Sequence, residues 1–261
     1  MKSYSFVIYL MCNWIEWNIF PLSNTIYLRQ WVLYHIKSSL VDGMSFDTMD
    51  PRLKHPFGAV ISGPTCCGKS HLLRKMLERG EEVIDGAPQN IIWCHGMYQP
   101  AHDEMMETIP NITFIEGLPS DLETRIDPTK RNLIVIDDLM NELSNNKRLT
   151  NIFTKSCHHL NLSCFLILHN VFCQGKEIRN ISLNAHYLFI FKSPRDSSQI
   201  THLAKQMYPG NVKFMQEAFI DATSKPYGYL LCDLKPETDD QFRLWTNLFP
   251  EETQYVYVRK V

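Results

Sequence analysis

The sequence predicts an α/β fold in which helices flank a central, mainly parallel sheet. Three observations support this fold class. Short apolar runs of strand length recur along the chain, tracts with apolar residues at helical spacing separate some of them, and several runs end in polar or acidic residues. Strands that alternate with helices favour a parallel sheet, whose strands are almost continuously apolar because helices cover both faces. With 44% hydrophobic residues, the 261-residue chain can build one sizeable core of this kind.

The expected elements follow in chain order. A strand at residues 57–62 precedes a helix that includes residues 71–77. Each further strand is a short apolar or β-branched run, and these runs are expected at residues 90–95, 111–115, 132–138, 163–169, 185–191, 227–233 and 255–258. A charged stretch at 121–130 is expected to cover the sheet, and helices are expected at 149–160 and from residue 200 onward.

Residues 63–70, Gly-Pro-Thr-Cys-Cys-Gly-Lys-Ser, match G-x-x-x-x-G-K-[ST], the pattern of the phosphate-binding loop or P-loop. Gly63 and Gly68 allow backbone conformations in which consecutive N–H groups converge on a phosphate. Lys69 supplies positive charge to the β- and γ-phosphates, and the Ser70 hydroxyl is a ligand for Mg²⁺. The positive end of the following helix faces the same anion.

The position of this motif matters as much as its pattern. It lies between the strand at 57–62 and the helix at 71–77, which is the context that a P-loop requires. The alternative is an ordinary glycine turn between a strand and a helix. We expect a P-loop NTPase with ATP and Mg²⁺ as cofactors, whose nucleotide-binding segment comprises Gly63, Pro64, Thr65, Cys66, Cys67, Gly68, Lys69, Ser70 and His71.

Two carboxylates end the buried, β-branched run at residues 132–138. A central parallel strand has this composition and carries its functional groups at the carboxyl end. Asp137 is expected to hold Mg²⁺ through water or together with Ser70. Asp138 is then placed to orient or deprotonate the attacking water. A strand that ends in a solvated acidic turn is the alternative.

An additional strand is expected between the P-loop strand and the Asp137 strand. It separates the chain from compact nucleoside kinases and favours the RecA-like branch of P-loop proteins, which includes rotary and ring motors. His169 and Asn170 follow the strand at 163–169 and could contact the γ-phosphate or the attacking water. For His169, a hydrogen bond to the backbone is the alternative.

Two arginines follow the later strands. Arg179 is expected in the loop after the strand at 163–169, and Arg195 follows the strand at 185–191. A guanidinium that reaches the γ-phosphate of a neighbouring subunit would stabilise transition-state charge and make hydrolysis depend on assembly. One of these two is a candidate for that role. A solvated or Asp-paired arginine is the alternative for each.

Charge and cysteine content limit the possible classes of protein. The formal net charge is −2, so no global basic field points to nucleic acid, although a ring-shaped motor can grip DNA with a few pore-loop residues. The eight cysteines form no C-x-x-C pair, and Cys157-His158-His159 lacks the further ligands of a zinc site. This usage favours a reducing intracellular compartment over a disulfide scaffold.

The beginning of the chain has a different character from the rest. No apolar stretch reaches the roughly 18 residues of a membrane span, and no small-residue cleavage site follows the apolar segment at 4–11. We therefore expect neither a membrane protein nor a secreted one. Residues 1–43 are rich in Trp, Tyr and Ile without clear periodicity, and Met44 or Met49 would be a plausible start. Residues 1–48 are expected to be an appended extension or a gene-model artefact, and 49–261 the ATPase domain.

From residue 55 to residue 258 the chain resembles the genome-packaging ATPases of Polinton/Maverick elements and adintoviruses. These are relatives of the poxvirus packaging ATPase in the FtsK–HerA superfamily. Besides the P-loop and 134–140 (Ile-Val-Ile-Asp-Asp-Leu-Met), the resemblance rests on His-Pro-Phe-Gly at 55–58, the segment 149–163 with its His158-His159 pair, and the motifs at 182–187, 191–196 and 227–230.

The resemblance implies an ATP-driven ring, a hexamer, that threads double-stranded DNA into a preformed capsid. It implies nucleotide and Mg²⁺ contacts for Lys69 and Ser70, Mg²⁺ for Asp137 and the catalytic carboxylate for Asp138. It also implies a capsid or portal protein as partner, and a location in the host nucleus, a viral factory or the virion. The family's strand-end sensor is usually Gln followed by Asn, whereas this chain has His169-Asn170.

Two other classes of function stay open at this point. One is a nucleotide-binding but hydrolytically impaired relic or domesticated element protein, and the other is a generic P-loop kinase or regulator. Intact Lys69, Ser70, Asp137 and Asp138 favour an active motor over a relic. Contacts to DNA phosphates would be salt-sensitive and independent of sequence. The candidates for them, on the segment beyond Asp137, are Lys147, Arg148, Lys155, His158 and His159.

Overall fold

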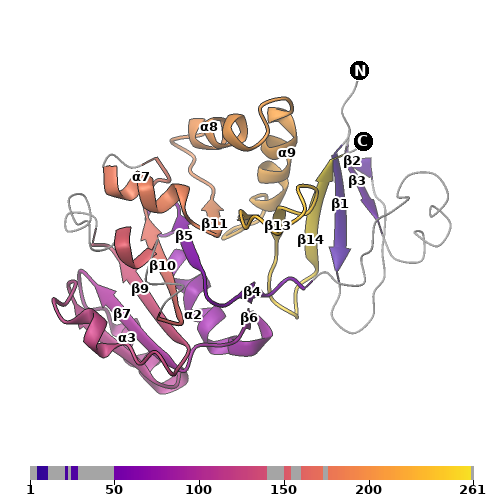
Figure 1. Ribbon diagram of the computed structural model, residues 1–261. Helices are drawn as coiled ribbons and strands as arrows, with labels where there is room; N and C mark the ends of the chain where they lie inside the picture. Colours follow the sequence, from indigo (N-terminus) through magenta and orange to yellow (C-terminus); the bar gives the residue numbers. More distant parts are fainter. Residues whose placement is uncertain are drawn as a thin grey trace. The chain divides into compact units, whose positions relative to one another are not determined.

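The computed structural model describes residues 50–139, 150–153, 160–172 and 176–259, and the backbone of 5–10, 21–22 and 25–28 (Figure 1). The chain divides into two compact units. One is Leu53–Ser193, and the other combines Met1–Arg52 with Pro194–Val261. No helix among the described residues is long and apolar enough to cross a membrane.

The unit Leu53–Ser193 is built on a parallel sheet. Its strands are almost wholly buried, which explains their continuous apolar sequence. In spatial order they are β11 (Tyr187–Phe191), β5 (Gly58–Ser62), β10 (Leu162–Leu168), β9 (Asn132–Asp137), β7 (Asn90–His95) and β8 (Ile112–Glu116). A short parallel pair, β4 (Leu53–Lys54) with β6 (Ile84–Asp85), forms a separate sheet.

The order of these strands brings distant parts of the chain together. β10 lies between β5 and β9, and Ile167 is in register with Asp137 while Leu168 is in register with Ser62. The additional strand expected beside the P-loop strand is therefore β10. Because parallel strands share a carboxyl edge, the segments that follow Ser62, Asp137 and Leu168 all begin at the same edge of the sheet.

Two helices of this unit contact each other through charged side chains. Arg74 of α2 (Lys69–Arg79) donates to Glu78 at 2.8 Å and to Glu104 of α3 (Pro100–Thr108) at 2.6 Å. α2 begins after Gly68 and ends at Gly80, and its buried side chains at 72, 73, 76 and 77 form one face toward the core. The remaining described helices of the unit are the 3-10 turns Gly80–Glu82 and Leu122–Arg125, and α7 (Lys176–Leu183).

Helix α3 was not expected from the sequence, because its nine residues carry few apolar side chains. Its start nevertheless has a recognisable signal: Pro100 occupies the first turn, and the Gln99 N–H donates to the His102 ring at 3.3 Å. α7 was also missed. Of the helix expected at 149–160, residues 150–153 are helical and 154–159 lie outside the described residues.

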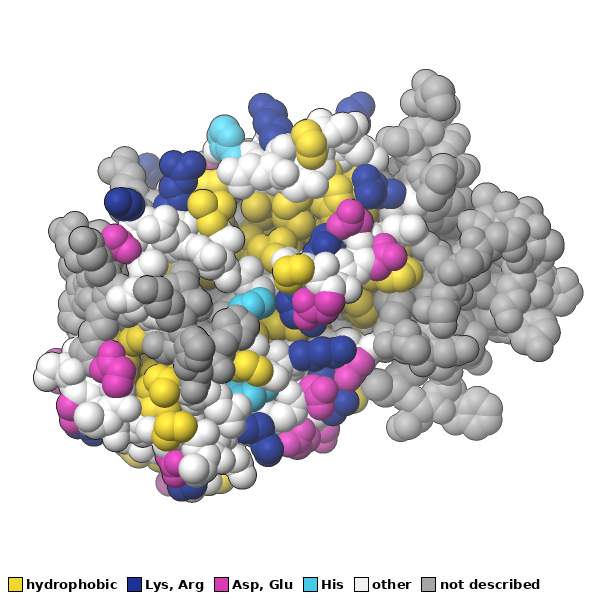
Figure 2. Space-filling model, in the orientation of Figure 1, with side chains coloured by type: hydrophobic (Ala, Val, Ile, Leu, Met, Phe, Trp, Pro, Cys, Tyr) yellow, Lys and Arg dark blue, Asp and Glu magenta, His cyan; other side chains and the backbone are white. Residues whose placement is uncertain are grey.

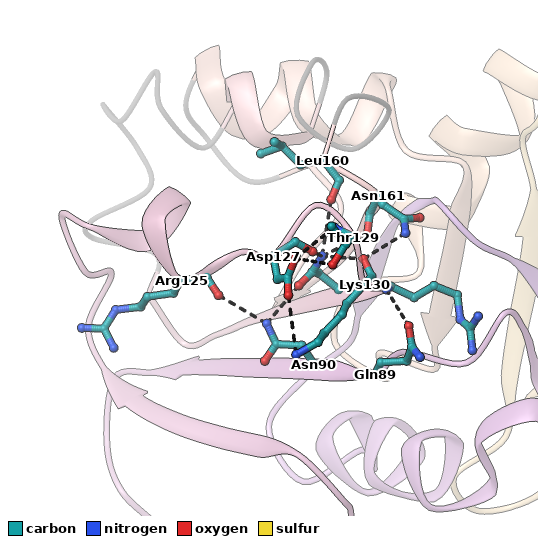
Figure 3. A network of polar contacts seen from close by, with 10 residues as sticks. Gln89, Asn90, Arg125, Asp127, Thr129, Lys130, Leu160 and Asn161 are labelled. Atoms are coloured by element: carbon teal, nitrogen blue, oxygen red, sulfur yellow. Dashed lines mark hydrogen bonds and ion pairs between the residues drawn. The ribbon is translucent and has the colours of Figure 1, made fainter.

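The amino ends of the strands are joined by a network around one buried amide (Figure 3). The Asn132 side chain, 1% exposed at the start of β9, donates to the carbonyl oxygens of Asp127 at 2.7 Å and Lys130 at 2.8 Å. Asn90 donates to the Asn132 amide oxygen at 2.9 Å, and Asn161 donates to the Lys130 carbonyl at 2.9 Å. This network ties the charged stretch before β9 to the ends of β7 and β10.

The second unit has mostly antiparallel pairing. In spatial order its strands are β12 (Tyr229–Asp233), β13 (Leu244–Thr246), β14 (Gln254–Arg259), β1 (Ser5–Leu10), β3 (Thr25–Leu28) and β2 (Pro21–Leu22). Among the described strand pairs of this unit, β1–β3 is parallel and the others are antiparallel. The connection from β12 to β13 contains no helix, which suits antiparallel neighbours. α8 (Ser198–Met207) and α9 (Val212–Ala222) complete the described part, and together they form the helical tract expected from residue 200 onward.

Candidate active site

The P-loop follows β5 and leads directly into α2. A Cβ atom added to Gly63 would lie 2.6 Å from both the Phe191 Cβ and the Cys67 Sγ, so only glycine fits there. Gly68 has a φ of 103°, which is a left-handed conformation that glycine adopts freely. Gly68 thus has the backbone conformation that the sequence predicted, whereas Gly63 is required by close packing and has no positive φ.

The Lys69 side chain folds back onto the P-loop. Its side chain is 8% exposed, and the ammonium group donates to the Gly63 carbonyl at 2.7 Å and to the Pro64 carbonyl at 2.8 Å. The charge is therefore already held at the loop, at the position from which a bound phosphate would be reached. Thr65, Ser70 and His71 are exposed on the same segment.

The two cysteines of the loop differ in environment. Cys66 is exposed and has a φ of 62°, an uncommon conformation for a residue with a Cβ atom. Cys67 is half-buried, and burial raises the pKa of its thiol while the Lys69 charge opposes the rise. The Cys67 thiol therefore ionises less easily than a thiol in water.

Ser70 and Asp137 meet at the carboxyl edge of the sheet. The Ser70 Oγ lies 3.5 Å from the Asp137 Oδ2. Burial raises the pKa of Asp137, the neighbouring Asp138 charge adds to the rise, and the Lys69 charge opposes it. A divalent cation would relieve this burial cost, and a hydroxyl beside a carboxylate is an oxygen donor pair that suits Mg²⁺.

The donor set fits magnesium better than a metal held by protein alone. Among the described residues, no group of three His, Cys, Asp or Glu side chains could enclose an ion. Mg²⁺ typically takes one or two protein ligands and completes its shell with water and substrate phosphates. Ser70 and Asp137 match that pattern.

Asp138 and His169 come together at the same edge. The His169 Nε2 lies 3.5 Å from the Asp138 Oδ1, and the two side chains are 52% and 70% exposed. Asp138 has a φ of 55°, so the chain turns sharply where β9 ends. Two strand-end residues that are 31 positions apart in the sequence thus form one solvent-facing pair beside the Ser70–Asp137 pair.

Gly96 supports this turn and was not recognised in the sequence. A Cβ atom at Gly96 would lie 2.7 Å from the Asp138 carbonyl oxygen. The Gly96 N–H donates to the Asp137 carbonyl at 3.1 Å. A glycine directly after the buried strand 90–95 was the available signal.

His95 was predicted only as a strand residue, but it neighbours Asp137. The two residues are in register between β7 and β9, and His95 is 5% exposed. Its ring lies 4.9 Å from that of His102, which stacks on Phe114 at 4.4 Å. Burial lowers the pKa of His102. This ring cluster packs beside the acidic strand end.

The other predicted site residues are less closely connected. The Asn170 Oδ1 accepts a hydrogen bond from the Phe172 N–H at 2.7 Å, so the amide oxygen belongs to a local turn. Arg179 is exposed on helix α7 and not in a loop as expected, and Arg195 is exposed in the other compact unit. The candidates for DNA contact, Lys147, Arg148, Lys155, His158 and His159, lie outside the described residues.

Comparison with known proteins identifies the fold. No protein-family model and no curated protein matches the chain. The chain is similar to the genome-packaging NTPase B204 from Sulfolobus turreted icosahedral virus 2 in complex with ATP-gammaS, with a TM-score of 0.51 and 13% identity over 73% of this chain and 96% of that one. It is equally similar (TM-score 0.51, 12% identity) to B204, the DNA-packaging ATPase from Sulfolobus Turreted Icosahedral Virus, over 70% and 94% of the two chains.

At this level of identity the likeness shows the fold alone. The chain has the α/β fold of P-loop NTPases, with a central, mainly parallel sheet flanked by helices. The fold class predicted from the sequence is confirmed.

Proposed function

We propose that this protein is an ATP-hydrolysing translocase that packages double-stranded viral or transposon DNA into a capsid. The observation that carries the proposal is the convergence of four side chains at one sheet edge. Ser70 lies 3.5 Å from Asp137, and Asp138 lies 3.5 Å from His169. Ser70 follows β5, the two aspartates come at the end of β9, and His169 follows β10, which lies between those two strands. This arrangement supplies a phosphate cradle, a metal seat and a solvent-facing carboxylate.

The roles of the residues follow from their positions. Lys69 and the loop amides bind the β- and γ-phosphates, for which Lys69 exchanges its bonds to the loop carbonyls. Ser70 and Asp137 hold Mg²⁺, which supplies charge neutralisation on the phosphates when it is bound. Asp138 orients a water molecule and accepts its proton as the water oxygen bonds to the γ-phosphorus and the bond to the ADP oxygen breaks.

His169 is expected to form a hydrogen bond to the same water or to the γ-phosphate. Its imidazole can donate a hydrogen bond to phosphate while it faces Asp138. Asn170 is proposed to assist from the adjoining turn. Arg179 or Arg195 is proposed to reach the γ-phosphate of a neighbouring subunit, which would couple hydrolysis to ring assembly.

The partners belong to the same proposal. They are double-stranded DNA held through phosphates, identical subunits in a hexameric ring, and a capsid or portal protein. The fold likeness to packaging NTPases and the Polinton-like motifs support this assignment. The proposed location is the host nucleus, a viral factory or the virion. On the face in Figure 2, the described Lys and Arg side chains lie singly or in small groups, and several of them adjoin Asp or Glu.

The test is ATP turnover by the purified protein with and without duplex DNA. The wild type should hydrolyse ATP in the presence of Mg²⁺, lose the activity in EDTA, and be stimulated by the duplex. Asp138→Asn should lower turnover by about 100-fold or more, since a catalytic base contributes rate of that order, while ATP binding persists. Glu116→Gln, a carboxylate at the end of the edge strand β8, is the matched control and should retain activity. Unchanged turnover in Asp138→Asn would contradict the assignment of Asp138.

The contact between His169 and Asp138 favours a second candidate, a nucleotide-binding protein with impaired hydrolysis. A carboxylate engaged by an imidazole is less available to water. In that case the wild type binds ATP with Mg²⁺ but does not turn it over, and His169→Gln restores hydrolysis. The translocase proposal is supported instead if the wild type is active and His169→Gln changes its rate only modestly.

A further inference from the structure

The unit that contains Pro194–Val261 has a cavity of about 640 Å³. That volume is in the range of small-molecule sites and far exceeds the space of a single ion. Apolar side chains form part of the wall, and the polar groups come from three segments: Tyr208 and Asn211 after α8, Asp240 and Arg243 before β13, and Arg259 at the end of β14.

Tyr208 contributes a hydroxyl group to which no described residue forms a hydrogen bond. The residue is 5% exposed, and its hydroxyl is buried with no hydrogen-bond partner among the described residues. Burial raises the pKa of Tyr208 well above its usual range, so the group is a protonated donor. The hydroxyl has almost no accessible surface of its own, so a ligand oxygen would reach it through a small shift of the wall, and an acceptor there would relieve the free-energy cost of the missing partner.

The two arginines of the wall differ in their partners. Arg243 donates to the Asp240 carboxylate at 2.7 Å and to the Lys235 carbonyl at 2.9 Å, so its charge is compensated. The Arg259 guanidinium lies 5.3 Å from the centre of the Tyr208 ring and forms no ion pair with any described residue. The charged groups of the wall therefore sum to one positive charge.

The start of α9 adds to this positive potential. Asn211 is the N-cap residue and lies in the cavity wall, its side chain forms no capping hydrogen bond, and the first turn carries no acidic residue. The amino end of an 11-residue helix favours an anion nearby. Gly210 beside it has open space where a Cβ would lie.

We propose that this cavity binds a small organic anion, a phosphate or carboxylate group carried on an apolar body. Arg259 and the Tyr208 hydroxyl bind the oxyanion beside the start of α9, and the apolar wall around Met207 and Leu234 accommodates the body. The site lies outside the P-loop unit and does not depend on ATP hydrolysis.

The experiment measures binding by calorimetry with full-length Lys69→Ala protein, in which the P-loop no longer competes for phosphate. The probes are phenyl phosphate, benzoate and the uncharged benzyl alcohol. The two anions distinguish a phosphate headgroup from a carboxylate. At least one of them should bind, and benzyl alcohol should bind much more weakly.

Two variants and one control locate the binding. Tyr208→Phe and Arg259→Gln should each weaken binding by about tenfold, because each removes a hydrogen bond to a charged group. Tyr208→Phe should not lower the melting temperature, since the hydroxyl has no partner to lose. Lys205→Gln removes an exposed positive charge on α8 that does not line the cavity, and should leave binding unchanged.

Several outcomes would overturn the proposal. They are absence of binding of both anions at millimolar concentration, equal affinity for benzyl alcohol, and anion binding that is unaffected in both variants. Competition by a short DNA duplex would overturn it as well, because the cavity would then be part of a DNA-binding surface.

Discussion

Single residues at this P-loop edge act largely through their size and backbone conformation. Gly63 allows close contact with Phe191, and Gly96 allows the Asp138 carbonyl to approach within a distance that any side chain would block. Only the first was predictable, because Gly63 belongs to a known motif. The role of Gly96 depends on a neighbouring strand, and no local pattern in the sequence contains that information.

The protonation state of His55 is set by the residues around it. Its Nδ1 lies 2.6 Å from the Ser163 Oγ and its Nε2 lies 2.9 Å from the Asn161 Oδ1. The Ser163 Oγ also accepts a hydrogen bond from the Phe57 N–H at 3.1 Å. These partners are satisfied by a neutral ring that accepts at Nδ1 from the Ser163 hydroxyl and donates at Nε2.

We predict that stability decreases as the pH falls below 6.5, the ordinary pKa of histidine. Burial lowers the pKa of His55, so between the lowered value and 6.5 the unfolded chain binds more protons than the folded one. The free energy of unfolding therefore rises with pH in this window. Its slope, measured by urea unfolding from pH 5 to 7.5 (about the range in which histidine titrates), should decrease in His55→Gln.

His102 also has a lowered pKa, so part of the slope should remain in that variant. His202→Gln, at an exposed position of α8, should retain the wild-type slope. An equal slope in wild type and His55→Gln would contradict the prediction.

At the scale of elements, the strands were predicted better than the helices. β5, β7, β9, β10 and β11 lie within two residues of the expected ranges because buried parallel strands have a continuous apolar signature. The helices α3 and α7 were missed. They are short, and their apolar residues face only one side, so polar residues interrupt the pattern. The charged stretch 121–130 proved to contain a 3-10 turn, Leu122–Arg125.

The polar start of β9 leads to a stability prediction. Asn132→Leu should lower the free energy of unfolding by roughly 2–3 kcal/mol, because carbonyl groups around a buried amide would lose their donor. Asn184→Ala removes an exposed amide that donates to the Asn180 carbonyl, and should change stability by less than about 0.5 kcal/mol. Chemical denaturation of both variants measures the difference. A cost for Asn132→Leu no larger than that of the control would show that the network contributes little.

At the scale of the whole molecule, two predicted features remain predictions. One is the boundary between an extension at 1–48 and a domain at 49–261. β1, from the early part of the chain, pairs with β14 near its end, and the functional importance of that pairing is open to deletion experiments. The other is assembly into a ring, for which the exposed Arg179 and Arg195 are the proposed contacts to a neighbouring subunit.

If one of these arginines acts in trans, turnover per subunit should rise with protein concentration. Adding excess Arg179→Ala or Arg195→Ala protein to the wild type should then reduce turnover by more than simple dilution, because each altered subunit leaves a neighbour without its guanidinium. Arg79→Ala, an exposed arginine on α2, should dilute activity only in proportion. Proportional behaviour of all three mixtures would argue against a trans-acting arginine at these positions. The measurement is steady-state ATP hydrolysis at fixed wild-type concentration.

The sequence by itself determined the P-loop, the acidic strand end and the α/β class, since each depends on residue types and on spacing within a short segment. The tertiary structure decided the neighbours. Only the placement of β10 between β5 and β9 brings His169 to Asp138, and only the register of β7 with β9 sets Gly96 and His95 beside Asp137. These contacts join residues that are dozens of positions apart, and strand order is settled by the packing of the whole sheet.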